Sequence, residues 1–177
     1  MDVETLAALL GIAIGLPAVF LYQRLKSERT LAREAYSVLA AQLSRRAALV
    51  PELVEAARPR APQHEACIAA VSEFLAATQA ARDPEARFGQ ERALSDRLGT
   101  LMAQPAFAAD ARFHELAGKL AEVESEVQYA RRYYNGAAKE YDRRLEAFPA
   151  SLIGRVLGFR PMPAFETADR REVEVSL

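Results

Sequence analysis

The sequence predicts an all-α protein in which one N-terminal transmembrane helix continues into an elongated antiparallel bundle of about four helices and a short extended tail packed on the bundle. Three observations lead to this fold class: an uncharged run near the N-terminus, apolar residues spaced alternately three and four apart, and prolines that divide this pattern into segments. The expected organisation is a short N-terminus at 1–4, a transmembrane helix at 5–22, a helical domain at 23–160 and a tail at 161–177.

The uncharged run extends from Thr5 to Tyr22. At roughly 18 residues and about 1.5 Å of rise per residue, it just reaches across a hydrocarbon core of about 30 Å. A cleaved signal peptide is disfavoured, because the N-terminus carries Asp2 and Glu4 rather than basic residues. The competing interpretation is a buried helix of a soluble protein, but the run has no polar face, so a retained single-pass anchor is favoured.

A basic cluster follows the run directly. Its members are Arg24, Lys26, Arg29 and Arg33. Because segments rich in Lys and Arg stay in the cytoplasm, the cluster predicts a protein of the bacterial cytoplasmic (inner) membrane with its N-terminus outside and its C-terminal domain in the cytoplasm. The same residues can contact anionic headgroups at roughly 1 kcal/mol each, although topology determination alone would also require them. The lone Cys67 suits the cytoplasm, since it cannot form an intrachain disulfide.

Inside the predicted anchor, Ala7, Gly11 and Gly15 recur every four residues. This small-xxx-small spacing lets two membrane helices approach closely, so it predicts self-association into a homo-oligomer. The alternative is that Ala and Gly are simply frequent in membrane helices.

Periodicity places a long helix from about Ala109 to Ala147. The apolar positions that share one coiled-coil-like face are Phe113, Leu116, Leu120, Val123, Val127, Ala130, Tyr134, Ala137 and Tyr141. A similar seam follows the anchor, with members Ala32, Ala35, Leu39, Leu43, Arg46, Val50 and Leu53. At Pro51 this helix either kinks or gives way to the first turn of a new segment.

Further helices are expected after Pro59 and Pro62 and again after Asp83-Pro84, where aspartate would cap a helix that has proline at its first position. Prolines in the tail preclude helix there, and the alternation of polar and apolar residues at 172–177 favours an extended or strand-like piece.

Arg46 is the exception among the seam positions because it is charged. We expect its guanidinium to reach an acidic side chain on the long helix, Glu122, Glu124 or Glu126, and thereby to fix helix register, because an unpaired buried guanidinium is costly. The alternative is that its stem lies on the core while its head reaches water.

The sequence offers little chemistry. His64-Glu65 lacks the second histidine of a zincin motif, since position 68 is Ile68, and no glycine-rich phosphate loop or nucleophile elbow is visible. We therefore expect no catalytic residue, metal or cofactor. The net charge is −1, and the doubled arginines are diluted by acids, so no nucleic-acid partner is expected either.

Three motifs resemble those of the LemA family. The first is Leu43-Ser44-Arg45-Arg46 followed by Leu49-Val50-Pro51, the second is Ala130-Arg131-Arg132-Tyr133-Tyr134-Asn135 with Phe148-Pro149 after it, and the third is Gly158-Phe159-Arg160-Pro161 with Phe165. The positions that match the family and that we expect to be structural are Arg45, Arg46, Pro51, Tyr134, Asn135, Phe148 and Pro149.

The resemblance, which covers nearly the whole chain, implies a bacterial single-span membrane protein with a cytoplasmic helical bundle and no settled activity. The chain departs from the family pattern at Tyr36, where a tryptophan is common, and at 102–113, which lacks the usual tyrosine-proline-aspartate stretch.

The expected function is therefore that of a non-enzymatic scaffold or adaptor, in contact with the lipid bilayer and with an unidentified membrane or cytoplasmic protein. The resemblance suggests a membrane protease or an envelope-stress signalling component as that partner. The main alternative is membrane remodelling or organelle assembly by a homo-oligomer, because magnetosome membrane proteins include LemA-like members. A hydrolase or metalloenzyme is a third class.

Overall fold

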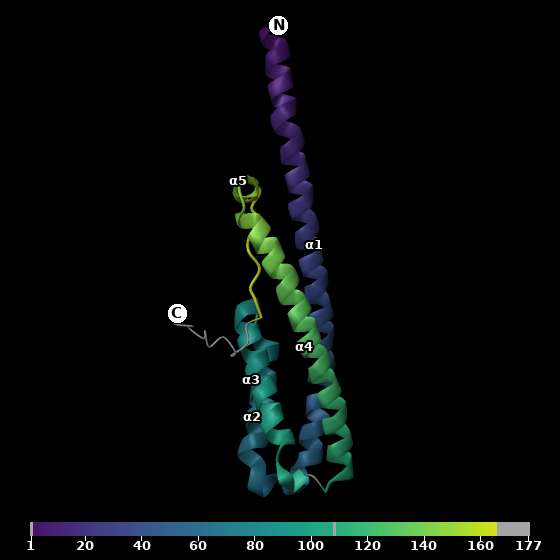
Figure 1. Cartoon of the computed structure of the whole chain (residues 1–177). Coiled ribbons are helices and arrows are strands. Elements are labelled where there is room, and N and C mark those ends of the chain that lie inside the picture. Colours follow the sequence, from purple (N-terminus) through teal and green to yellow (C-terminus); the bar gives the residue numbers. More distant parts are fainter. Residues whose placement is uncertain (1, 108, 166–177) are drawn as a thin grey trace, which may run out of the picture. The chain divides into compact units, whose positions relative to one another are not determined.

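The computed structural model describes residues 2–107 and 109–165. Within these residues the chain is all-α, with five α-helices in an antiparallel bundle and no strand (Figure 1). The helices are α1 (Val3–Ala57), α2 (Ala61–Ala80), α3 (Pro84–Met102), α4 (Ala111–Glu146) and α5 (Ala150–Val156), and two 3-10 turns are η1 (Arg58–Arg60) and η2 (Pro105–Phe107). The predicted fold class is confirmed at this level, but the prediction of about four helices is wrong because α5 is a separate helix.

The chain divides into two compact units. Unit 1 comprises Met1–Ser37 and Tyr133–Pro163, and unit 2 comprises Val38–Arg132 and Ala164–Leu177. Helices α1 and α4 are each divided between the two units. Helices α2 and α3 belong to unit 2, and α5 belongs to unit 1.

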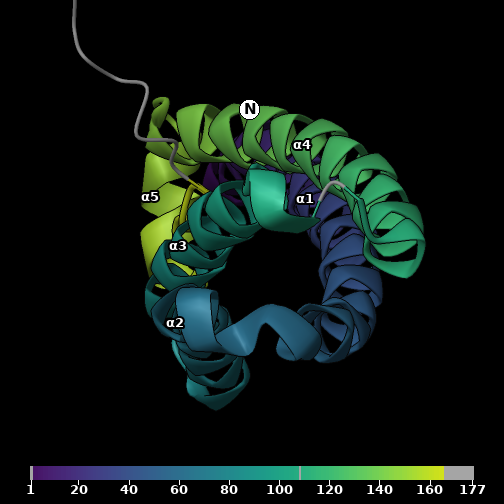
Figure 2. The ribbon, with the colours of Figure 1, turned by 90° about the horizontal axis from the view of Figure 1, so that it is seen from below.

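Unit 2 is a four-helix arrangement around an apolar core. Helices α2 and α3 lie side by side in it (Figure 2). The core side chains that are at most 1% exposed include Val50, Leu53, Val71, Leu94, Leu98, Leu101, Phe107 and Leu120. Burying one such side chain stabilises the fold by roughly 1.5–3 kcal/mol, so this cluster carries much of the stability of the unit.

Unit 1 has a smaller core at which α1, α4 and α5 meet. Its buried members are Leu25, Ala32, Tyr141, Leu145 and Ala150. Gly154 of α5 packs so closely on Leu145 that a Cβ at position 154 would overlap the Leu145 side chain. The approach of α5 to α4 therefore depends on a small residue at this position.

The two predicted seams agree closely with the observed burial. Every predicted position of the α1 seam is at most 2% exposed, Arg46 included. On α4 the agreement fails at one residue: Ala138 is 2% exposed, whereas the predicted Ala137 is only partly buried. A strict alternation of three and four drifts from the true helical period, and this displaces the prediction by one residue near the end of a long helix.

Several helix ends lie where the sequence predicts them. The Asp83 carboxylate accepts a hydrogen bond of 2.9 Å from the backbone N–H of Ala86 at the start of α3, with Pro84 at the first helical position. Asp110 plays the same part for α4, where it accepts from the N–H of Phe113 at 2.9 Å. The long predicted helix at 109–147 is confirmed as α4.

The structure decides between the two alternatives left open at Pro51. Helix α1 passes through Pro51 and ends only at Ala57, so no new segment begins there. Pro62 lies within the first turn of α2 rather than before it, which suits proline because the first-turn N–H groups have no partner inside the helix. The tail is non-helical at 161–165, and the strand-like piece predicted at 172–177 lies outside the described residues.

No helix in the described part of the chain combines the length and the apolar character that a membrane crossing requires. Of the predicted transmembrane helix at 5–22, the side chains of residues 6–10 and 14 lie outside the described part.

Candidate functional site

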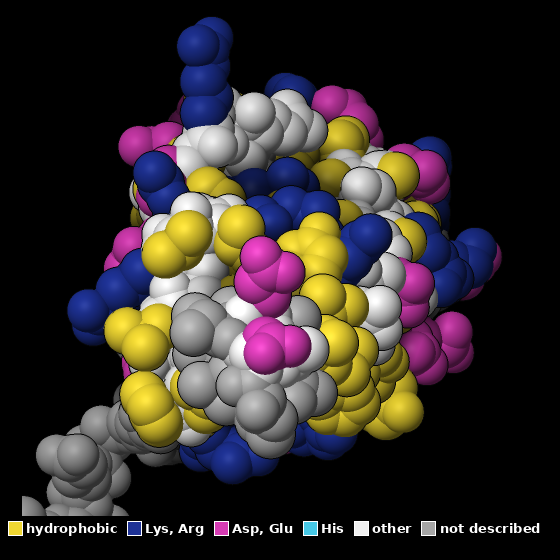
Figure 3. All heavy atoms as spheres, turned by 90° about the horizontal axis from the view of Figure 1, so that it is seen from above, with side chains coloured by type: hydrophobic (Ala, Val, Ile, Leu, Met, Phe, Trp, Pro, Cys, Tyr) yellow, Lys and Arg dark blue, Asp and Glu magenta, His cyan; other side chains and the backbone are white. Residues whose placement is uncertain are grey.

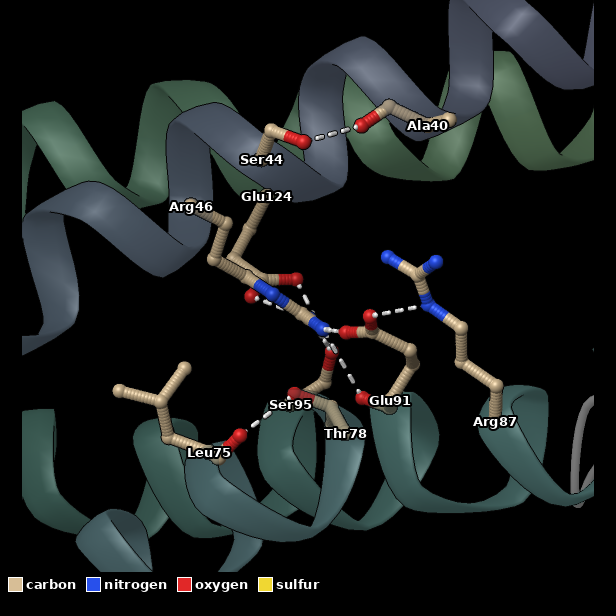
Figure 4. A network of polar contacts seen from close by, with 9 residues as sticks. All are labelled: Ala40, Ser44, Arg46, Leu75, Thr78, Arg87, Glu91, Ser95 and Glu124. Atoms are coloured by element: carbon tan, nitrogen blue, oxygen red, sulfur yellow. Dashed lines mark hydrogen bonds and ion pairs between the residues drawn. The ribbon is translucent and has the colours of Figure 1, made fainter. Parts of the chain in front are cut away.

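The most ordered polar site is a buried ion-pair network in unit 2, centred on Arg46 of α1 (Figure 4). Its Nη1 donates to Glu124 Oε1 of α4 at 2.9 Å and also contacts the Ser95 hydroxyl of α3. Its Nη2 donates to the Glu91 carboxylate and, at 3.2 Å, to the Glu91 backbone carbonyl. One guanidinium therefore joins three helices.

The remaining partners complete the network. Ser95 donates its hydroxyl to Glu124 Oε2 at 3.1 Å, and Arg87 Nε lies 3.5 Å from Glu91 Oε1. The arrangement thus sets two guanidinium groups against two carboxylates. Since a buried charge is tolerated only when it is paired, this balance explains why Arg46 and Glu91 can be 1% and 4% exposed.

The predicted partnership of Arg46 with an acid of α4 is confirmed for Glu124, and the alternative that its head reaches water is wrong. Sequence reasoning missed Glu91 and Ser95. A signal for Glu91 was present, because it lies three residues after Phe88 and three before Leu94, on the buried face of α3. Arg46 and Glu91 are out of reach of a dissolved substrate, so the network connects helices and has no open reaction centre.

A second site in unit 1 fastens the segment after α5 onto α4. The Tyr134 hydroxyl donates to the carbonyl of Pro163 at 2.6 Å, and the Tyr141 hydroxyl donates to the carbonyl of Arg160 at 3.0 Å. Between them, the Asp142 carboxylate accepts from the backbone N–H of Met162 at 3.0 Å. These three side chains supply hydrogen bonds for a segment that has no regular secondary structure of its own.

Burial shifts the pKa values of three side chains at this site. It raises the pKa of Tyr134 to about 12, with the neighbouring Tyr36 and Asp142 adding to the effect. It also raises the pKa of Tyr141 and of Asp142 above their ordinary values, although the Met162 N–H opposes the effect on Asp142. At all three groups burial therefore disfavours the ionised form relative to the same group in water.

The third family-like motif provides one anchor point in each unit. In unit 1, the Phe159 ring lies edge-on to the Tyr22 ring, with 6.1 Å between the ring centres. The Arg29 guanidinium carbon lies over the Phe159 ring, 5.4 Å from its centre. In unit 2, Phe165 is 3% exposed and packs on the Phe88 ring at 4.5 Å. The motif thus has a packing role at both positions.

The predicted headgroup-contacting cluster is divided by the structure. Arg24, Lys26 and Arg33 are exposed, whereas Arg29 is half-buried against Phe159. Three of the four cations are therefore directed towards solvent, and Arg29 has a partner within unit 1.

The predicted self-association stripe is only partly described. At Gly11 and Gly15, no atom outside the local helix lies within 4 Å of the position that a Cβ would take. The side chain of Ala7 lies outside the described residues.

The remaining motif positions differ in burial. Tyr134 is buried and Asn135 is half-buried, whereas Pro51, Phe148 and Pro149 are exposed. Arg45 is exposed as well, and it donates to the Gln42 side chain at 3.1 Å. The family-like pattern therefore includes positions that packing does not explain.

Among residues 2–107 and 109–165, no three His, Cys, Asp or Glu side chains gather in a way that could hold a metal ion. The His64 ring packs on Phe107 with 5.1 Å between the ring centres.

The model of the LemA family matches residues 35–177, well over half of the chain. No curated protein matches the sequence.

Proposed function

The chain belongs to the LemA family, and from this premise we propose that it is a non-enzymatic scaffold, anchored in the bacterial cytoplasmic membrane, whose helical bundle binds a protein partner in the cytoplasm. The observation that carries the proposal is the exposure of large apolar side chains along the N-terminal part of α1. Ile12, Leu16, Val19 and Phe20 are each more than half exposed.

A lipid environment would remove this apolar surface from water. Soluble proteins rarely leave a contiguous apolar patch uncovered, and here the patch lies within a run of roughly 18 residues without a charge. The exposed Arg24 and Lys26 follow directly, as expected at the cytoplasmic end of a span.

The adaptor part of the proposal draws on unit 2. An open groove of about 530 Å³ runs between α1 and α4, with a rim that includes Arg45, Lys119 and Glu126 and a floor that includes Leu49 and Val123. Mixed charge around an apolar floor suits a protein–protein interface, because such an interface has a polar rim and an apolar centre. The partner suggested by the family likeness is a membrane protease or an envelope-stress signalling component.

A second candidate is membrane remodelling or organelle assembly by a homo-oligomer. The observation that favours it is the open space beside Gly11 and Gly15, which a second copy of α1 could fill at close range.

Anchoring and orientation are tested on the full-length protein. After cell lysis and ultracentrifugation, the protein should stay in the pellet through alkaline extraction. In a Cys67→Ser background, Asp2→Cys should react with an impermeant maleimide on intact spheroplasts, and the exposed Ser125→Cys should react only after lysis. Recovery in the supernatant, or equal labelling of Ser125→Cys before lysis, would overturn the proposal.

The two candidate functions are separated by affinity capture from detergent-solubilised membranes. One abundant integral-membrane partner, whose recovery falls with Lys119→Glu in the groove but not with Lys139→Glu elsewhere on α4, supports the adaptor. Large homo-oligomers that deform liposomes, and that are lost with Gly11→Leu, support remodelling. Stoichiometric metal that disappears with His64→Ala would instead revive the metalloenzyme class.

A further inference from the structure

Helix α5 buries small residues and exposes two of its three large apolar residues, while the third, Ile153, is half-buried. It buries Ala150 and Gly154, which pack on the core of unit 1. It exposes Leu152 and Val156, which are four residues apart and are 55% and 84% exposed. A helix at a water-facing surface buries its large apolar residues, so the medium outside α5 is expected to be apolar.

The flanks of α5 continue the same surface. Phe148 before the helix is 82% exposed, and Leu157 after it is 52% exposed. From 147 to 159 the only charged side chain is Arg155. This stretch contains no acid, and Arg24 and Arg143 line the pocket at its N-terminal end. The local charge therefore matches an anionic surface rather than a basic one.

The position of α5 along α1 is fixed by contacts within unit 1. Ala150 shares a core cluster with Leu25, and the ring of Phe159 lies 6.1 Å from that of Tyr22. Tyr22 is the last residue of the uncharged run. The apolar face of α5 is thus level with the turn at which α1 would leave a bilayer. In the space-filling view from above, hydrophobic side chains adjoin Lys and Arg side chains (Figure 3).

We propose that residues 147–159 form a second membrane contact, in which α5 lies in the headgroup region of the same bilayer that holds α1. This inference rests on the proposed anchoring of α1. The ligand is a phospholipid surface with anionic headgroups: Phe148, Leu152, Val156 and Leu157 enter the acyl boundary, and Arg24 and Arg155 remain among the phosphates. The contact would fix the orientation of unit 1 against the membrane.

The absence of tryptophan from the chain gives a direct test. Four single-tryptophan variants of the full-length protein, one of them a repeat on the same face of α5, are reconstituted into phosphatidylglycerol-containing vesicles with and without brominated lipids, which quench tryptophan only at short range. Leu152→Trp reports on α5, and Phe20→Trp reports on the anchor. Tyr133→Trp is the matched control, because position 133 is exposed on α4 and lies about 20 Å along that helix from its C-terminal end.

The expected result is a loss of emission in brominated vesicles for Leu152→Trp and Phe20→Trp and none for Tyr133→Trp. Val156→Trp, on the same face, should repeat the loss seen at position 152, which guards against a local folding defect. Replacing phosphatidylglycerol by a neutral lipid should weaken quenching at position 152 and leave position 20 unchanged.

The other outcomes decide between distinct failures. Quenching at position 20 without quenching at 152 and 156 overturns the α5 contact and leaves the anchor intact. Absence of quenching at all positions overturns the anchor and the α5 contact together. A blue-shifted emission at position 152 without quenching means that the tryptophan is buried in protein rather than in lipid. If the shift reverts when the protein is diluted with lipid, a second copy of the chain covers α5; if it does not revert, another part of the same chain does. Either result overturns the proposal.

Discussion

Arg46 and Glu124 are 78 positions apart in the sequence, yet Arg46 Nη1 and Glu124 Oε1 lie 2.9 Å apart inside unit 2. Both belong to long helices, α1 and α4, whose buried seams are largely apolar, so apolar contact alone specifies the register less sharply than a charge pair does. A buried guanidinium that must meet Glu91 and Glu124 at once removes this freedom, because any other register leaves charges unpaired. We therefore expect the pair to fix the register of the helices as well as to join them.

Arg46→Met should destabilise the protein by about 3–5 kcal/mol, because it leaves Glu91 buried without its main cation. The measurement is chemical denaturation of the detergent-solubilised full-length protein, combined with its oligomeric state by light scattering. The neighbouring Arg45→Met is the matched control: Arg45 is exposed, so a change within about 0.5 kcal/mol is expected. Adding Glu91→Leu to Arg46→Met should restore part of the loss, since the carboxylate that then lacks its cation is Glu124, which is partly exposed and keeps its hydrogen bond from Ser95.

If Arg46→Met unfolds at the wild-type denaturant concentration and keeps the wild-type oligomeric state, then the network does not fix register.

The Arg46 network also shows what the sequence could and could not predict. The three-four seam placed Arg46 at a buried position, and burial of a guanidinium required an acid, which led to Glu122, Glu124 or Glu126; the structure selects Glu124. Glu91 was missed because the partner of Arg46 was expected on the long helix, whereas Glu91 lies on α3. Local geometry alone could not decide between a kink and a new segment at Pro51: Pro51 is exposed, whereas Val50 and Leu53 beside it are fully buried, and their packing stabilises α1 across the missing N–H.

Helix α5 could not have been predicted from periodicity. Its seven residues are too few for a periodic signal, and Leu152 and Val156 are exposed while Ile153 is only half-buried, so the usual rule that large apolar positions mark the core fails here. The pairing of Tyr134, Tyr141 and Asp142 with residues 160–163 was equally hidden, because backbone acceptors and donors carry no sequence signature.

Tyr134→Phe should lower the stability by about 1 kcal/mol, because it removes the hydroxyl that donates to the Pro163 carbonyl. The effect should depend on pH in a defined direction. Burial raises the pKa of Tyr134 to about 12 from 10.0, so folding favours the neutral phenol, and this contribution is lost as pH rises above 10. Thermal melts from pH 7 to 11 should therefore show the gap between wild type and Tyr134→Phe closing at the alkaline end. A gap that stays constant over this range would contradict the assignment.

Asp142→Asn should melt at the wild-type temperature or above it at pH 7. Asparagine keeps an oxygen acceptor for the Met162 N–H and removes a charge that burial disfavours. The raised pKa of Asp142 means that the ionised carboxylate destabilises the fold at neutral pH, and that this penalty fades as pH falls towards the ordinary value of 3.8. The advantage of Asp142→Asn should shrink in the same direction, while Asp142→Leu, which has no acceptor, should be less stable than wild type at pH 7. A lower melting temperature for Asp142→Asn at pH 7 would show that the charge is needed.

Two glycine-to-alanine substitutions in unit 1 should act in opposite directions. Gly158 has φ of +70° and closes α5 in a Schellman motif, in which the Phe159 N–H donates to the Gly154 carbonyl at 2.9 Å and the Gly158 N–H donates to the Arg155 carbonyl at 3.4 Å. Alanine at 158 adopts this left-handed conformation only with strain, so Gly158→Ala should destabilise by about 1 kcal/mol.

Gly136 lies inside α4 with no atom outside the local helix within 4 Å of a Cβ position, so Gly136→Ala should stabilise by about 0.5–1 kcal/mol through helix propensity alone. Since both substitutions add the same methyl group, the opposite signs isolate backbone conformation as the cause, and denaturation midpoints of the two variants measure it. Equal signs for the two variants would mean that Gly158 does not hold the left-handed conformation in solution, and the apolar face of α5 would then lose the turn that ends it.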